Sequence, residues 1–60
     1  MIRNIHDTAV VFYGGRLRED GTPSKAQMNT IRQMCQDGKF QTAFKIGRTW
    51  FTDMEREAGE

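Results

Sequence analysis

The chain has 60 residues, of which 37% are hydrophobic and 28% charged, and its formal net charge is +1. That length permits one domain with a thin core, because a domain of about 60 residues buries only about 60% of the surface that its unfolded chain exposes. The composition is that of a globular protein and excludes a disordered chain. The longest apolar run, at residues 9–13, is far shorter than the roughly 20 residues that span a bilayer. Without a signal-peptide pattern, we expect a cytoplasmic protein.

The small net charge is the sum of a basic segment and an acidic segment. Residues 1–52 contain eight Lys and Arg against four Asp and Glu, a net +4, whereas residues 53–60 contain one Arg against four acids, a net −3. We expect a basic folded domain with an acidic C-terminal tail or short helix, a modest electrostatic signature for binding nucleic acid. His6 and Cys35 stand alone, so we expect no metal site, no cofactor and no internal disulfide.

The first predicted element covers residues 5–13, "IHDTAVVFY", and two interpretations fit it. Ile5, Ala9, Phe12 and Tyr13 recur as one face of a helix, but the β-branched and aromatic run "TAVVFY" is also typical of a strand. The pattern alone leaves both open. If it is a helix, a short β segment around residues 1–3 can still precede it.

The second element is predicted to be a helix over about residues 25–37. Its start is marked by the capping box "SKAQ" at residues 24–27, and its end by the glycine at residue 38. Helical spacing gives it a buried face of Met28, Ile31 and Cys35.

The opposite face of this helix carries hydrogen-bonding side chains and no acid before residue 37: Lys25, Asn29, Arg32, Gln33 and Gln36. Most polar helix faces are only solvated, but such faces usually mix Glu with Lys to form ion pairs. Arg, Asn and Gln are the side chains that make paired hydrogen bonds to guanine and adenine in the major groove. The composition therefore favours a DNA-reading face.

The third element is a predicted hairpin with strands over about residues 42–46 and 49–52, "TAFKI" and "TWFT". A two-residue Gly47-Arg48 turn places Lys45 opposite Trp50, whereas a three-residue turn places Trp50 beside Phe44 and Ile46. The sequence leaves both registers open. In either one we expect an apolar face to pack on the helices, because an isolated two-stranded ribbon is marginal in water.

The predicted core combines the apolar positions of all three elements: Phe12, Met28, Ile31, Cys35, Phe44, Ile46, Trp50 and Phe51. Lys45 and Arg48 lie near the bend of the hairpin. Cations there are either ordinary solvated turn residues or contacts to phosphate or a minor groove.

Four short motifs follow one another after the second element: Gly38-Lys39-Phe40, Phe44-Lys45-Ile46, Gly47-Arg48 and Trp50-Phe51. In order and spacing, the run "SKAQMNTIRQMCQDGKFQTAFKIGRTWF" resembles the small winged-helix DNA-binding domains of phage and mobile-element excisionases, in the MerR-like helix-turn-helix group. The resemblance covers about half of the chain. Two features depart from the family: the linker at residues 14–23 is long, and the second helix has one arginine where many relatives have several.

The resemblance implies a small α+β winged helix as one domain over residues 1–60. Its first helix would span about residues 6–13 and its recognition helix about residues 25–37, with the hairpin as the wing. The expected contacts to double-stranded DNA come from the recognition-helix residues Lys25, Asn29, Arg32, Gln33 and Gln36 and the wing residues Lys45, Arg48 and Thr49.

The implied function is that of an excisionase, which bends DNA with neighbouring copies of itself and helps an integrase, in the cytoplasm or nucleoid of a bacterial host. The alternatives are a small phage or plasmid transcriptional regulator and, more remotely, a protein-interaction module such as a packaging-enzyme small-subunit domain. We do not expect an enzyme, a small-molecule substrate or a membrane partner. His6 lacks an evident nucleophile and no phosphate-binding glycine motif is present.

Overall fold

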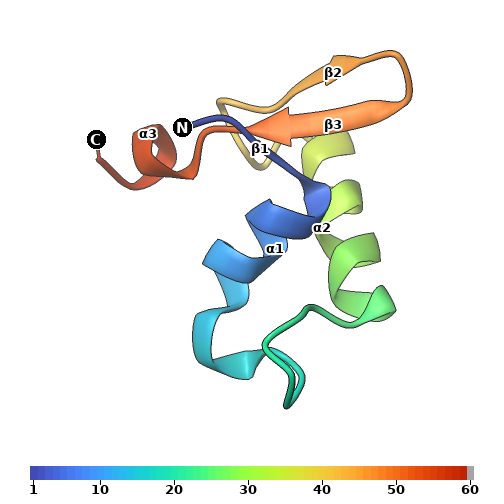
Figure 1. The fold of residues 1–60 in the computed structure, drawn as a ribbon. Coiled ribbons are helices and arrows are strands. Elements are labelled where there is room, and N and C mark those ends of the chain that lie inside the picture. The colour runs from blue at the N-terminus through green and yellow to red at the C-terminus, as the bar shows by residue number, and fades with distance from the viewer. Residues whose placement is uncertain (60) are drawn as a thin grey trace.

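The computed structural model describes residues 1–59 and has an α+β architecture, with three α-helices and a three-stranded antiparallel sheet. α1 and α2 lie on one side of the sheet, and α3 lies at the end where the two termini meet (Figure 1). The elements in chain order are β1 Arg3–Asn4, α1 Ile5–Tyr13, the 3-10 helix η1 Gly14–Arg16, α2 Lys25–Gln36, β2 Phe44–Ile46, β3 Thr49–Thr52 and α3 Met54–Gly59.

The ambiguous first element is a helix, α1. Asn4 caps it, because its side chain accepts a hydrogen bond from the backbone N–H of Asp7 at 2.8 Å. Ile5, Thr8 and Ala9 turn towards the core. The predicted helix over about residues 6–13 is confirmed, and the β segment before it is strand β1.

The caps predicted for α2 are present. The Ser24 hydroxyl accepts from the N–H of Gln27 at 3.1 Å, and the Gln27 side chain accepts from the N–H of Ser24 at 2.9 Å. The helix ends at Gln36, one residue before the predicted end, and Asp37 is its C-cap. Gly38 follows with φ 77°, a left-handed conformation that glycine adopts at little cost.

The sheet has the strand order β1-β3-β2. In the hairpin, Lys45 pairs with Trp50 and Ile46 with Thr49, so the two-residue turn is the correct one of the two registers. Strand β2 begins at Phe44 and not at residue 42, because Thr42 lies in a turn and bonds to α3.

The core differs from the predicted one. Its buried hydrophobic residues are Ile5, Ala9, Ile31, Cys35 and Phe40, and Met28 and Trp50 pack against them half-buried. Ile31 and Cys35 are therefore confirmed. Phe12, Phe44 and Ile46 were predicted wrongly, since they are 44%, 38% and 64% exposed.

Strand alternation explains the wrong prediction for the hairpin. Trp50 and Thr52 share the face of β3 that meets the helices, so the alternate residues Thr49 and Phe51 point the other way, together with Phe44 and Ile46 of β2. Phe51, also predicted in the core, is half-buried but stacks on Phe44 on this outer face, with ring centroids 5.5 Å apart, and does not pack against the buried core. The face that buries the largest ring is the one that packs on the helices.

Phe12 lies at the margin of the core. Its ring meets the buried Phe40 edge to face at 5.8 Å and Tyr13 at 5.1 Å, and the residue remains 44% exposed. Within residues 1–59, no helix is both long enough and apolar enough to pass through a membrane.

Candidate nucleic-acid interface

The polar face of α2 is exposed along its length. All five predicted residues are solvent-accessible: Lys25, Asn29, Arg32, Gln33 and Gln36. Two short bonds order part of this face. An Arg32 guanidinium N–H donates to the Asn29 side-chain oxygen at 2.9 Å, and the Gln33 amide donates to the Asp37 carboxylate at 3.0 Å. Lys25 and Gln36 have no side-chain hydrogen bond within the described residues.

The hairpin presents its cations at and near the turn. Lys45, Arg48 and Thr49, the predicted wing contacts, are exposed. The Lys45 ammonium lies 5.6 Å from the centre of the Trp50 ring, within the range of a cation–π contact. Among residues 1–59, Arg48 has no hydrogen-bond or ion-pair partner, and its side chain is exposed. Gly47 beside it has φ 62°, which fixes the tight turn that carries the arginine.

A hollow of about 300 Å³ joins the two predicted sites. We call it the helix–hairpin hollow. It lies between the start of α1, the middle of α2 and the hairpin, and it brings Arg32 of α2 together with Arg48 and Thr49 of the hairpin. Lys25 and Lys45 do not line it. The structure thus unites one predicted helix residue with two predicted hairpin residues, and leaves the others on the surrounding surface.

Burial divides the lining of this hollow into a floor and a rim. The floor is the buried or half-buried set Ile5, Met28 and Trp50. The rim is exposed and polar, and consists of Asn4, His6, Arg32, Arg48 and Thr49. No acid lines the hollow within the described residues, although the chain has eight Asp and Glu against nine Lys and Arg. The nearest carboxylate along the chain is that of Asp7, whose Oδ1 lies 3.1 Å from Nδ1 of His6.

His6 and Asn4 are rim residues that the sequence did not identify. The signal for them is only indirect, because they are the cap and a first-turn residue of α1, and the angle of α1 to α2 depends on the fold. A larger hollow of about 480 Å³ lies against Arg18, Glu19 and Asp20 in the linker. It contains two acids and none of the predicted contacts, so its size does not make it the better site.

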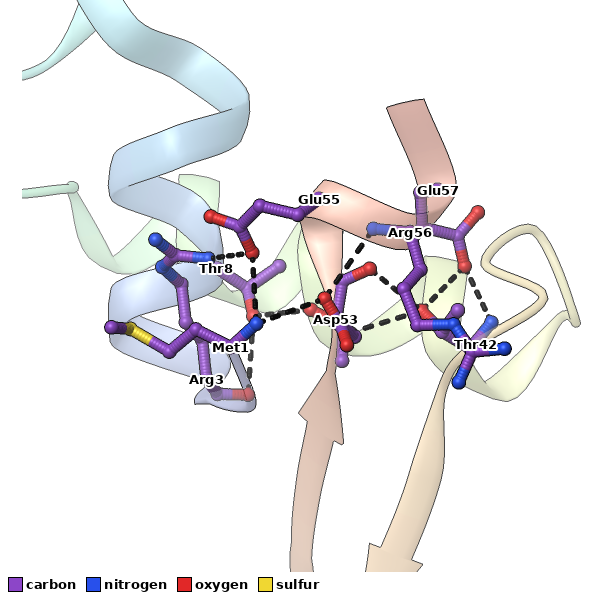
Figure 2. A network of polar contacts seen from close by, with 9 residues as sticks. Met1, Arg3, Thr8, Thr42, Asp53, Glu55, Arg56 and Glu57 are labelled. Atoms are coloured by element: carbon purple, nitrogen blue, oxygen red, sulfur yellow. Dashed lines mark hydrogen bonds and ion pairs between the residues drawn. The ribbon is translucent and has the colours of Figure 1, made fainter. Parts of the chain in front are cut away.

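The acidic end of the molecule is a network of internal bonds (Figure 2). Glu55 of α3 accepts from the Arg3 guanidinium at 2.6 Å and from the Met1 amine at 3.3 Å. The bond from Arg3 lowers the pKa of Glu55 from 4.5 to about 2, since it favours the charged carboxylate. Asp53, at the start of α3, also lies 3.2 Å from the Met1 amine.

Thr42 connects the same end to the hairpin (Figure 2). Its hydroxyl donates to the Glu57 carboxylate at 2.6 Å, and its backbone N–H donates to the same oxygen. The N–H of Asp53 donates in turn to the Thr42 hydroxyl at 3.0 Å. Of the two predicted alternatives, an acidic tail or a short helix, the structure has the helix, tied to β1 and to the turn before β2. The sequence showed its negative composition but not its partners.

Two further buried features contain polar or reactive side chains: the pair Thr8 and Thr52, and the thiol of Cys35. Thr8 and Thr52 are fully buried and share a hydrogen bond of 2.8 Å between their hydroxyls. Burial raises the pKa of the Cys35 thiol above its ordinary value, which keeps it protonated. Among the described residues, no three His, Cys, Asp or Glu side chains gather at a position where they could hold a metal ion.

Comparison of the chain with protein-family models, with curated proteins and with solved structures found no match.

Proposed function

We propose that this chain is a winged-helix domain that binds double-stranded DNA. In this proposal α2 lies in the major groove and the β2–β3 hairpin is the wing, which contacts the adjacent backbone or minor groove. The observation that carries it is the surface shared by α2 and the hairpin. This surface joins a helix face of Arg, Asn and Gln to two exposed hairpin cations, with no acid in the hollow between them.

The side chains of this surface differ in the part of DNA to which they can bond. The amides of Gln33, Gln36 and Asn29 are uncharged and suit hydrogen bonds to base edges, whereas Lys45 and Arg48 suit phosphates. Lys25 is at the N-terminal end of α2, where it suits a phosphate at the groove margin.

Within this function, we propose that the domain acts as an excisionase. The support is the resemblance described above, together with the small surface of a domain of 60 residues, which favours several copies bound side by side to bend DNA. An integrase is the expected protein partner. A transcriptional regulator would use the same DNA surface and differ only in what it recruits.

A protein-interaction module is the second candidate. It is favoured by one observation: the sheet face away from the helices exposes Phe44 and Ile46, and exposed apolar patches often bind proteins. In that case the chain would bind duplex DNA weakly or not at all.

The test separates base reading from backbone contact. A preferred duplex is first selected from a random library, and binding of variants to it and to a scrambled duplex is then measured by fluorescence anisotropy. Gln36→Ala is expected to reduce the preference for the selected duplex by about 1–3 kcal/mol and to leave binding to the scrambled duplex nearly unchanged. Gln36 is a clean probe, because no described side-chain bond depends on it.

Arg48→Ala is the contrasting variant. It is expected to weaken binding to both duplexes and to reduce the salt dependence by about one unit, because a wing cation contacts phosphate and not bases. Equal loss of both duplexes with Gln36→Ala, combined with a pure loss of preference with Arg48→Ala, would reverse the two roles. Failure of the unmodified chain to bind any duplex would refute the proposed function.

A further inference from the structure

The helix–hairpin hollow has two kinds of surface, and their arrangement matches one chemical unit. Its floor of Ile5, Met28 and Trp50 is apolar, and its rim carries the guanidinium groups of Arg32 and Arg48. A deoxyribose with its phosphate is divided in the same way, since the sugar presents carbon atoms and the phosphate a localised negative charge. Arginine can also bond to a guanine edge, but the apolar floor suits the carbon atoms of a sugar better than a polar base edge. A metal ion would need acids, and none lines the hollow within the described residues.

We propose that the hollow binds one deoxyribose-phosphate unit of a DNA backbone. The phosphate lies between the guanidinium groups of Arg32 and Arg48, and the sugar lies against Trp50 and Met28. We call this site the seat. It rests on the DNA-binding function proposed above. It would be the backbone position at which the helix and the wing contact the same strand.

The two arginines are suited to one shared anion. Guanidinium groups bind phosphate through two parallel N–H bonds, and they tolerate partial burial against aromatic rings better than an ammonium does. Arg48 has no partner among residues 1–59, and Arg32 bonds only to a neutral amide, that of Asn29 at 2.9 Å. Both therefore retain free donors and full charge, and two cations on one rim repel each other until an anion lies between them.

The two arginines of the seat come from different elements of the fold. Arg32 is held by α2, and Arg48 by the hairpin turn. A phosphate that binds both fixes the hairpin relative to the helix. Asn29, which holds Arg32 by its side-chain oxygen, is a positioning residue for this contact.

The first experiment is a double-mutant cycle on duplex binding at fixed salt. Arg32→Ala and Arg48→Ala are each expected to weaken binding about tenfold or more, as hydrogen bonds to a charged group do. If both bind one phosphate, the double variant should lose about twentyfold and not the hundredfold product. The matched control is Lys25→Ala with Arg48→Ala. Lys25 lies on the same helix face but outside the hollow, so these two losses should multiply.

The outcomes distinguish this seat from the function on which it rests. An unmodified chain that does not bind duplex DNA refutes both. A chain that binds duplex DNA while the Arg32 and Arg48 losses multiply, as the control losses do, refutes the seat and leaves the function intact. Circular dichroism of the variants checks that each remains folded, which is expected because both arginines are exposed.

The second experiment uses Trp50, the single tryptophan of the chain, as a reporter in the floor of the hollow. Titration with a short duplex is expected to change its fluorescence in a saturable way. Inorganic phosphate at the same total phosphate concentration is expected to leave the fluorescence unchanged. An unchanged signal with the duplex would overturn the seat. An equal change with inorganic phosphate would replace it by a site for a free anion.

Discussion

The two ends of this molecule use charge in opposite ways. At the end formed by α3, the acids form hydrogen bonds within the fold: Glu55 accepts from Arg3, and Glu57 accepts from Thr42 (Figure 2). At the end formed by α2 and the hairpin turn, Arg48 has no partner and Arg32 bonds only to an amide, within residues 1–59. The acids at the α3 end therefore stabilise the fold, whereas the two arginines at the other end remain available to bind a ligand. A net charge near zero therefore gives no measure of what the surface can bind.

This contrast changes the meaning of the acidic C-terminal segment. As a free tail, residues 53–60 would repel a bound duplex wherever they moved. As the helix α3, Met54–Gly59, the segment lies at the opposite end from the hairpin turn (Figure 1). The fold thus keeps the acids of α3 away from the hairpin turn, and the expected effect of these acids shifts from DNA affinity to stability.

The largest expected effect on stability is that of Glu57→Ala, which removes one of the bonded acids of α3. Loss of both bonds from Thr42 should lower the free energy of unfolding by about 2 kcal/mol, because bonds to a charged acceptor are worth about 1.5–3 kcal/mol. Urea denaturation measures it. The control is Glu19→Ala, an exposed acid in the linker with no described partner, which should change stability by less than about 0.5 kcal/mol. Equal effects of the two variants would mean that α3 is not tied to the fold.

The next effect concerns the buried contact between α1 and the end of β3, Thr8 with Thr52. Thr52→Val should cost about 1 kcal/mol, because it removes the bond between the two buried hydroxyls and leaves Thr8 only its longer bond of 3.4 Å to the Arg3 carbonyl. Replacing both by Val removes both polar groups and should restore much of the loss, again by urea denaturation. A double variant that is less stable than the single one would show that the hydroxyls contribute beyond their mutual bond.

A smaller effect is the pH dependence due to Glu55. Its pKa in the folded chain, about 2, lies below its ordinary 4.5, so the bond from Arg3 stabilises the fold fully above pH 4.5. That contribution is lost as the pH falls from 4.5 to about 2. The stability difference between the unmodified chain and Glu55→Gln should shrink over this interval, and added salt should reduce it, since the Glu55 carboxylate is exposed. A difference that is constant with pH would contradict the ion pair.

The smallest expected effect on stability is that of Arg48→Ala. An exposed turn cation without a partner should contribute less than about 0.5 kcal/mol to folding. Thermal unfolding of this variant should therefore match that of the unmodified chain, although its DNA affinity falls. A clearly destabilised variant would mean that Arg48 has a structural partner, and the contrast between the two ends would weaken.

Local signals in the sequence predicted local structure well. The capping box at residues 24–27 fixed the start of α2, and Gly38 its end. The Gly47-Arg48 turn was one of two open alternatives. The five polar residues of α2 were correctly expected on an exposed face, since helical spacing alone determines which side chains point together.

What failed depends on contacts distant along the chain. Both faces of the hairpin carry aromatic rings, so the pattern could not show that the Trp50 face, and not the Phe44 face, meets the helices. The partners of Glu55 and Glu57 lie 52 and 15 residues away. The helix–hairpin hollow depends on the angle between α1, α2 and the sheet, and no local pattern encodes that angle.

The most direct test of the proposed DNA-binding surface is the salt dependence of duplex binding by the unmodified chain. The cations available at the α2 and hairpin end are Lys25, Arg32, Lys45 and Arg48. If they make about three to five phosphate contacts, the logarithm of the binding constant should fall against the logarithm of salt concentration with a slope of about −3 to −4. Fluorescence anisotropy over a series of salt concentrations measures that slope. A slope near zero, or no binding at low salt, would contradict a DNA interface at this end of the molecule.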